Sequence, residues 1–140
     1  PVEDPLAEAR ATGAGIATLR FEVADVYRLD PAAGRYDVVH AHQVLQHLTD
    51  PVAALRAMGS VLTDDGVVAV RDADYAAMTW FPADERLDAW LATYRAVAKS
   101  NGAEPDAGRR LYAWARKAGF AEVTASASVW CYATPEERAW

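Results

Sequence analysis

The three histidines of the chain lie within one segment of eight residues, His40-Ala-His-Gln-Val-Leu-Gln-His47. Imidazole side chains bind zinc and exchange protons near neutral pH, so this segment could hold a metal or supply a general base. A zinc site needs a full set of ligands, and the segment contains no cysteine or carboxylate to complete one. We therefore expect no metal site. A metal-dependent enzyme that uses His40, His42 and His47 is the alternative that metal analysis would test.

Carboxylates follow two other strand-like segments. Asp25 comes just after residues 19–23, which alternate between apolar and polar side chains. It could accept hydrogen bonds from an amine or hydroxyl of a ligand, or it could simply form a turn. Asp72 and Tyr75 follow the apolar residues 67–70. They could orient a polar substrate or steer a proton, or they could belong to a solvated loop.

The elements that must position these residues alternate between strand and helix, which predicts an α/β domain with a mostly parallel sheet. In such sheets ligands bind at the carboxyl ends of the strands, where the candidate residues lie. We expect a turn at Asp64-Asp65-Gly66 and a capping box at Thr134-Pro-Glu-Glu137 that starts a last helix. The expected strands are 19–23, 36–41, 67–70 and 123–133, and the expected helices are 6–11, 51–62, 84–100 and 111–118.

Length and charge restrict the function classes. The 140 residues suit a single domain, residues 1–140. A net charge of −6, with no run of Lys or Arg, argues against nucleic-acid and membrane partners and weakly favours a small-molecule substrate. No apolar run approaches the about 20 residues of a membrane span. A single cysteine, Cys131, is typical of a reducing compartment, so we expect a cytoplasmic protein.

A family resemblance rests on four segments taken in order: Phe21-Glu-Val-Ala-Asp-Val26, Tyr36-Asp-Val-Val-His-Ala-His-Gln-Val-Leu-Gln-His-Leu48, Pro51-Val-Ala-Ala-Leu-Arg-Ala-Met58 and Val61-Leu-Thr-Asp-Asp-Gly-Val-Val-Ala-Val70. Their order and spacing, from about residue 5 to 124, resemble the class I S-adenosylmethionine-dependent methyltransferases, especially the ubiquinone/menaquinone-type branch. The resemblance implies a Rossmann-like sheet with helices on both faces. It also implies methyl transfer from S-adenosylmethionine to a small-molecule acceptor.

The resemblance assigns cofactor contacts to five positions. Asp25 matches the acidic residue that contacts the adenine amino group, and Val26 would offer its backbone N–H to the same ring. His40 and Ala41 match the strand end that lines the methionine part of the cofactor. Gln46 would lie close to the reactive methyl group.

Four further positions are assigned to the acceptor side. His47 would also lie near the methyl group, where it could act as a general base for an oxygen or carbon acceptor. The resemblance implies that Asp72 and Tyr75 face the acceptor pocket, and we group His42 with them as a substrate residue. Because the methyl group of a sulfonium is already activated, such an enzyme mainly aligns acceptor and donor.

The sequence departs from the family at both ends. The Gly-rich loop and the acidic residue that holds the ribose would lie before residue 1, and the last antiparallel strand is not evident after Thr134. We therefore expect a partial domain of a longer enzyme, with a sheet incomplete at its N-terminus and at its C-terminus. The alternative is a truncated or degenerate domain that acts as a binding or dimerisation module. Exposed sheet edges would favour such pairing. The sequence leaves open whether the protein forms a homo-oligomer.

Overall fold

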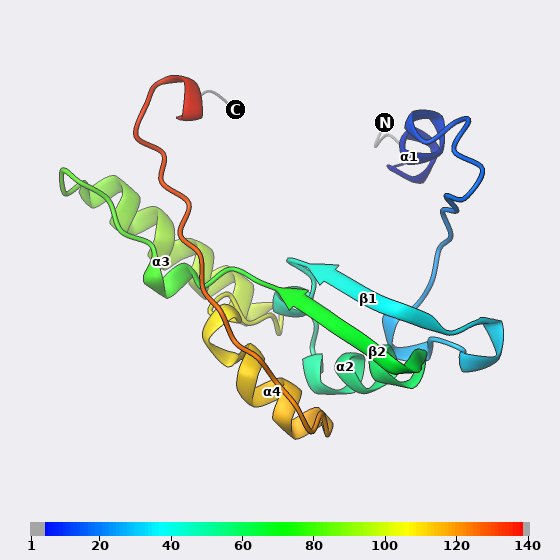
Figure 1. Ribbon diagram of the computed structural model, residues 1–140. Helices are drawn as coiled ribbons and strands as arrows, with labels where there is room; N and C mark the ends of the chain where they lie inside the picture. Colours follow the sequence, from blue (N-terminus) through cyan, green and yellow to red (C-terminus); the bar gives the residue numbers. More distant parts are fainter. Residues whose placement is uncertain (1–4, 139–140) are drawn as a thin grey trace.

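Two parallel strands and the helix between them form the centre of the fold. The structure is a computed structural model that describes residues 5–138. Strand β1 (Tyr36–His42) pairs in parallel with β2 (Leu62–Arg71), and helix α2 (Pro51–Ser60) connects them. Figure 1 shows the strands side by side with α2 along one face. Because the strands are parallel, both carboxyl ends lie at the same edge of the sheet.

The remaining helices are arranged around this unit. Helix α4 packs beside α2, whereas α3 extends away from the sheet (Figure 1). Short 3₁₀ turns join the elements. The helices are α1 (Pro5–Thr12), α3 (Glu85–Ser100) and α4 (Leu111–Ala118), and the turns are η1 (Val26–Arg28), η2 (Pro31–Ala33), η3 (Leu45–His47), η4 (Tyr75–Ala77), η5 (Gly108–Arg110) and η6 (Glu136–Arg138).

Local capping explains where the main helices begin and end. The Asp50 carboxylate accepts the Ala53 N–H at 2.9 Å, and Pro51 occupies the first turn of α2. Helix α3 begins after Asp84, whose carboxylate accepts the Arg86 N–H. Helix α4 ends at Gly119, whose φ of 110° is costly for a residue with a side chain. These three helices, like α1, lie where the sequence predicts them.

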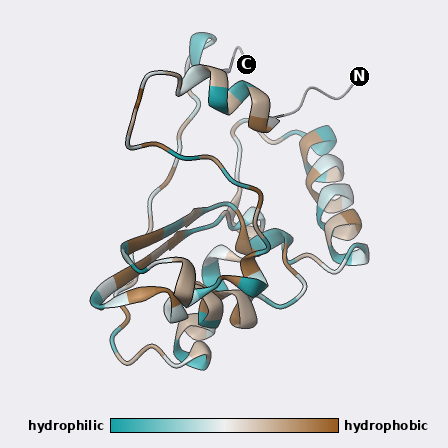
Figure 2. Cartoon of the chain, turned by 90° about the vertical axis from the view of Figure 1, so that its right-hand side faces the viewer, coloured by the Kyte–Doolittle hydropathy of each residue, from teal (hydrophilic) through white to brown (hydrophobic). Residues whose placement is uncertain are grey.

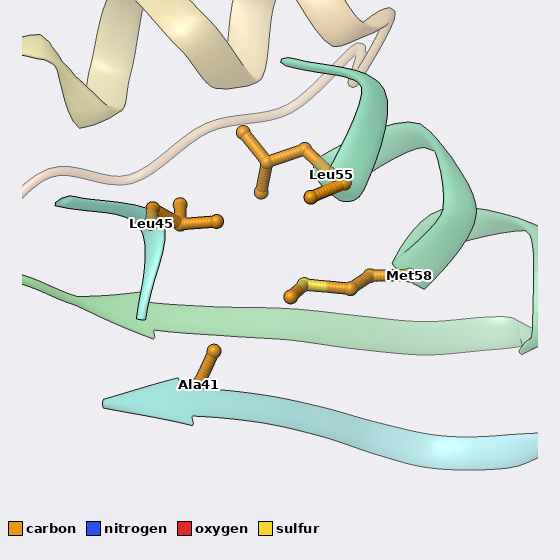
Figure 3. Packing of buried hydrophobic residues seen from close by; sticks show 5 residues of the cluster. Ala41, Leu45, Leu55 and Met58 are labelled. Atoms are coloured by element: carbon orange, nitrogen blue, oxygen red, sulfur yellow. The ribbon is translucent and has the colours of Figure 1, made fainter. Parts of the chain in front are cut away.

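The core lies between α2 and one face of the sheet. Ala41 of β1, Leu45 of η3, and Leu55 and Met58 of α2 point toward one another (Figure 3), and Ala54 completes the cluster. Full burial of a leucine side chain contributes about 1.5–3 kcal/mol relative to exposure, so Leu45 and Leu55, at 0% and 1% exposed, are major contributors. Helix α4 covers the edge of this core with Leu111, Trp114 and Ala118.

The two faces of the strand pair differ. Val39 and Ala41 of β1 face the core, with α2 and α4 packed around them. Val38 and its partner Val67 lie on the opposite face, where they are 62% and 57% exposed. Figure 2 shows the hydrophobic colouring that runs along both strands. The α/β class with parallel strands is confirmed, and in residues 5–138 the core is covered by helices on one face of the pair.

Two expected strands are not formed, and the prediction for them was wrong. Residues 19–23 and 123–133 lie outside regular secondary structure, and the ladder in the described part of the chain contains β1 and β2. A strand is defined by hydrogen bonds to a neighbour, whereas alternation of side chains marks only which residues share a face. The alternating pattern therefore predicted which side chains share a face, but it could not supply the neighbouring strand that a sheet requires.

The expected turn at residues 64–66 is also corrected. These residues lie inside β2, at an irregularity where Tyr36 pairs with Leu62 but Val38 pairs with Val67. From Tyr36 to Val38 the chain of β1 advances by two residues, while its partner β2 advances by five, from Leu62 to Val67. Strand β2 therefore contains three extra residues at this point. A Cβ on Gly66 would lie 2.9 Å from the Tyr36 carbonyl oxygen, so the close approach of the two backbones requires glycine here.

The capping box near the C-terminus is confirmed. Thr134 Oγ1 accepts the Glu137 N–H at 3.2 Å, and Glu137 Oε2 accepts the Thr134 N–H at 2.8 Å. The box leads into the turn η6, and any continuation beyond residue 138 lies outside the described residues. Within residues 5–138 no helix combines the length and the apolar character that a membrane crossing requires.

Candidate functional site

The Asp72 side chain joins the carboxyl ends of the two strands. Asp72 follows β2, and its Oδ1 accepts the backbone N–H of Gln46 at 3.0 Å. The backbone N–H of Leu45 also helps to lower the pKa of this carboxylate. The turn η3, which carries Gln46 and His47 after β1, is therefore held against the end of β2. The structure thus brings together three of the predicted site residues.

Gln43 makes the bend that allows this contact. Its φ is 53°, in the left-handed region that residues other than glycine rarely adopt, and its N–H bonds to the Arg71 carbonyl oxygen at 2.7 Å. The bend turns the chain from β1 directly into η3. Sequence analysis missed Gln43, and since glutamine is not enriched in this conformation, the residue type offered no signal.

Gln46 and His47 form a side-chain pair. Gln46 is 3% exposed, and its Nε2 lies 3.1 Å from Nε2 of the exposed His47 ring. When His47 is neutral with its proton on Nδ1, its Nε2 can accept a hydrogen from the amide. The buried amide therefore orients an exposed imidazole at the strand ends.

Buried side-chain oxygens near the carboxyl ends of the strands lack hydrogen-bond partners in residues 5–138. Asp72 Oδ2, Gln46 Oε1 and Asp74 Oδ1 are buried, and none of the three has a hydrogen-bond partner among the described residues. Burial raises the pKa of Asp72, and the N–H groups of Gln46 and Leu45 and the charges of His47 and His42 offset only part of that rise. Buried acceptors of this kind are uncommon in folded proteins, and they fit a ligand that donates hydrogen bonds.

Tyr75, in the turn η4 after β2, remains protonated at neutral pH. Its ring lies 4.3 Å from the Tyr94 ring of α3. Burial, and then the hydrogen bond with the Tyr94 side chain, raise the pKa of Tyr75 to about 12. The phenol can donate a hydrogen bond to a ligand, but it is a poor candidate for a general base.

The segment 103–108 closes the site from the side of α3. The Glu104 N–H donates to the Gln46 carbonyl oxygen at 2.8 Å, and the Tyr75 N–H donates to the Pro105 carbonyl oxygen at 3.2 Å. The segment therefore contacts the loops that follow both strands. The buried side chain of Asp106 lies within it.

Asp106 anchors that segment and was missed by sequence analysis. It is 5% exposed, bonds to Arg95 of α3 at 2.6 Å and accepts the Ala76 N–H at 2.9 Å. Burial raises the pKa of Asp106, but the Arg95 guanidinium and the other bonds outweigh it, so the pKa lies below its usual value. Lys99 lies 3.8 Å away. Arg95 and Lys99 are four residues apart on one helix, a spacing that could have indicated a shared acidic partner.

His40, Ala41 and His42 are divided between the two faces of β1. Ala41 is buried in the core, so only its backbone can face a ligand. The His40 and His42 rings lie on the other face, with centroids 6.4 Å apart. His42 stacks at 6.4 Å on Trp130, which also contacts Arg71. In the described part of the chain no three His, Cys, Asp or Glu side chains gather as a metal site would require.

Asp25 and Val26 occupy the turn η1. The Asp25 carboxylate accepts the Tyr27 N–H at 2.9 Å and lies 3.6 Å from Arg28, and its side chain is 51% exposed. The turn-forming interpretation of Asp25 is thus realised, and half of the carboxylate surface stays open to solvent. Val26 packs against the core. Its packing fixes the turn relative to α2.

Comparison with known proteins assigns the chain to a family. A family model described as a methyltransferase domain matches residues 5–119, well over half of the chain. The chain belongs to the class I S-adenosylmethionine-dependent methyltransferases. An uncharacterized methyltransferase of Schizosaccharomyces pombe is 36% identical over 122 residues, which cover 86% of this chain and 44% of that protein. The chain therefore spans less than half the length of this relative.

The matched region of this methyltransferase domain contains the whole strand-end site. Residues 5–119 include β1, η3, β2 and the segment with Asp106. Trp130, which packs on His42, lies beyond the matched residues. The family assignment made from the four sequence segments is confirmed.

Proposed function

We propose that this domain binds S-adenosylmethionine and transfers its methyl group to a small-molecule acceptor, as part of a longer enzyme. The observation that carries the proposal is the site formed by Asp72, Gln46 and His47 at the carboxyl ends of parallel strands in a methyltransferase domain. In open α/β sheets, this edge is where ligands bind. The relative's greater length supports the context of a longer enzyme.

The cofactor supplies a methyl group that its sulfonium already activates. Its adenine amino group would bond to the Asp25 carboxylate, which keeps half of its surface available, and the Val26 backbone N–H would contact the same ring. The methionine part would lie along the His40 side chain and the Ala41 backbone. Gln46 would lie beside the reactive methyl group.

The acceptor would lie between the residues that follow both strands. Asp72 and His42 can accept or donate hydrogen bonds there, and Tyr75 can donate one because it stays protonated. His47 is the candidate general base, since its ring is exposed and oriented by the Gln46 amide. The protein's main contribution is alignment of the acceptor with the methyl group.

The net charge of the chain and its single cysteine support a small-molecule acceptor and a reducing compartment. The net charge of −6 would repel a nucleic-acid backbone, which favours a small molecule over a nucleic acid and over an anionic membrane. Cys131 is an exposed free thiol, which suits a reducing compartment such as the cytoplasm.

A second candidate function is a binding or dimerisation module. The exposed side chains of Tyr36, Val38 and Val67 support it, because an apolar sheet face can pair with another chain. Sedimentation of the purified protein would test it. A stable dimer that binds no cofactor would favour the module over the enzyme.

Calorimetric titration with S-adenosylhomocysteine tests the proposed function. We expect the complete protein to bind this demethylated cofactor saturably, at one site per chain. Binding by wild type that is lost when the ligand is replaced by adenosine alone would support recognition of both ends of the cofactor. Absence of binding by a folded, complete protein would contradict the proposal.

A further inference from the structure

Three aspartates lie at the strand-end site, and they differ in their counter-charges. Asp74 bonds to Arg109 at 2.7 Å, and Asp106 bonds to Arg95 at 2.6 Å. Asp72 has no Lys or Arg nitrogen within 4.0 Å in residues 5–138. Of the three aspartates, Asp72 is therefore the one whose charge no Lys or Arg side chain of the described residues balances.

The free acceptor atoms around Asp72 define what could balance that charge. The Gln46 N–H donates to Oδ1 of its carboxylate, while Oδ2 is buried without a partner among the described residues. Gln46 Oε1 is a second buried acceptor without a partner, on a side chain 3% exposed. Asp74 Oδ1 is a third, but Arg109 already neutralises its carboxylate. Two acceptors, one of them charged, call for a group that donates several hydrogen bonds and carries a positive charge. A protonated amine has three donors and no acceptor, which matches this need.

We propose that Asp72 Oδ2 and Gln46 Oε1 bind a protonated amine of a ligand. The inference rests on the proposed function in taking that ligand to be the cofactor or the methyl acceptor. A bound ammonium would neutralise a carboxylate that burial now penalises, and it would satisfy both unpartnered oxygens. The raised pKa of Asp72 agrees with this, because burial is its largest cause and the nearby histidines lower it only in part. The amine can come from the amino group of the cofactor or from the acceptor.

The first experiment tests the cofactor as the source. Calorimetry on the complete protein compares S-adenosylhomocysteine with its analogue that lacks the α-amino group. If the cofactor supplies the amine, wild type should bind the parent compound at least about tenfold more tightly, as expected for a charge-assisted hydrogen bond. In Asp72→Asn, the two compounds should bind with nearly equal affinity. Asn keeps an oxygen for the Gln46 N–H, and thermal melting would verify that the variant folds.

Asp74→Asn is the matched control. It removes a carboxylate from the same loop, but one that Arg109 already neutralises, so it should keep the wild-type affinity ratio. A ratio lost equally in both variants would overturn the proposal, because it would show a general effect of charge at this edge.

The second experiment tests the acceptor as the source and needs no cofactor. Butylammonium and butanol are titrated separately into the wild-type protein while the backbone amide resonance of Gln46 is followed by NMR. A shift that saturates with butylammonium, is absent with butanol and is lost in Asp72→Asn would place the amine on the acceptor. If Asp72→Asn leaves the cofactor ratio unchanged and butylammonium acts no differently from butanol, the proposal is wrong. Failure of wild type to bind S-adenosylhomocysteine would count against the proposed function, and the butylammonium titration would still decide this inference.

Discussion

The Asp72 carboxylate at the end of β2 accepts the backbone N–H of Gln46, 26 residues earlier in the chain, at 3.0 Å. The contact fixes the turn after β1 against the loop after β2. Asp72 performs this task while its second oxygen lies buried without a partner among the described residues. One side chain thus combines a structural bond with an unsatisfied acceptor, an arrangement typical of functional sites rather than of stable cores.

The pH dependence of stability should reveal this arrangement. Because burial raises the folded-state pKa of Asp72, the folded protein binds its proton more readily than the unfolded chain does. Ionisation of Asp72 therefore costs stability, progressively as pH rises above its ordinary value of 3.8. In urea unfolding, we expect Asp72→Asn to be at least as stable as wild type at neutral pH, with the difference shrinking toward acid pH. A variant clearly less stable than wild type at neutral pH would contradict the role given to burial.

Asp25→Ala should weaken binding of S-adenosylhomocysteine if the carboxylate contacts adenine. Loss of one charge-assisted hydrogen bond corresponds to roughly tenfold in affinity. Asp30→Ala is the matched control, because Asp30 also caps a 3₁₀ turn and bonds to the backbone N–H two residues later, at 2.8 Å. Calorimetry should show the loss in the first variant alone. Equal losses in both would mean that capping of the turns, and not adenine contact, sets the affinity.

His47→Ala should lower turnover more than cofactor affinity. Removal of a general base typically costs about 10²–10⁴ in rate. Turnover measured at saturating cofactor, together with calorimetry, separates the two effects once an acceptor is in hand. Collapse of cofactor affinity with turnover preserved at saturation would move His47 from the acceptor side to the cofactor side.

Arg95→Met should loosen the segment that closes the site. Among the described residues, the change leaves the buried Asp106 carboxylate with Lys99, at 3.8 Å, as its remaining cation within 4.0 Å. The pair contributes at neutral pH, and because Asp106 has a lowered pKa, its contribution disappears as pH falls below the ordinary value of 3.8. Hydrogen exchange should show faster exchange at Ala76, whose N–H bonds to Asp106. Arg86→Met, at the exposed pair with Asp84, should leave the exchange of Ala76 unchanged.

Leu55→Ala tests whether the core between α2 and the sheet supports the whole unit. Leu55 is 1% exposed, and truncation of such a side chain costs about 2–5 kcal/mol through lost burial and the cavity left behind. Leu87→Ala on α3 is the control, since Leu87 is 41% exposed. Urea unfolding should give a large loss for the first and a small one for the second. Similar losses would mean that α3 is packed more tightly in solution than this fold implies.

Local signals in the sequence account for much of the fold. The caps at Asp50 and Asp84 and the stop at Gly119 are short-range hydrogen bonds and backbone preferences, and the helices they delimit lie where predicted. The strand 36–41 and the apolar residues 67–70 were also read correctly, because continuous apolar runs of this length are typical of buried strands. The same locality explains the misreading of residues 64–66, whose composition favours a turn but which form an irregularity inside β2, between the residues that pair with Tyr36 and Val38.

The sequence by itself determined the family, the helices with their caps, and the presence of polar residues after the strands. Each of these depends on residues close together in the chain or on an ordered set of motifs. Only the tertiary structure decided that Asp72 bonds to Gln46, that Arg95 neutralises Asp106 while Asp72 stays without a basic partner, and that residues 19–23 and 123–133 find no strand to pair with. These outcomes depend on which distant segments meet and on how much water their contact excludes. Local spacing and composition encode neither the contacts between distant segments nor the water that those contacts exclude.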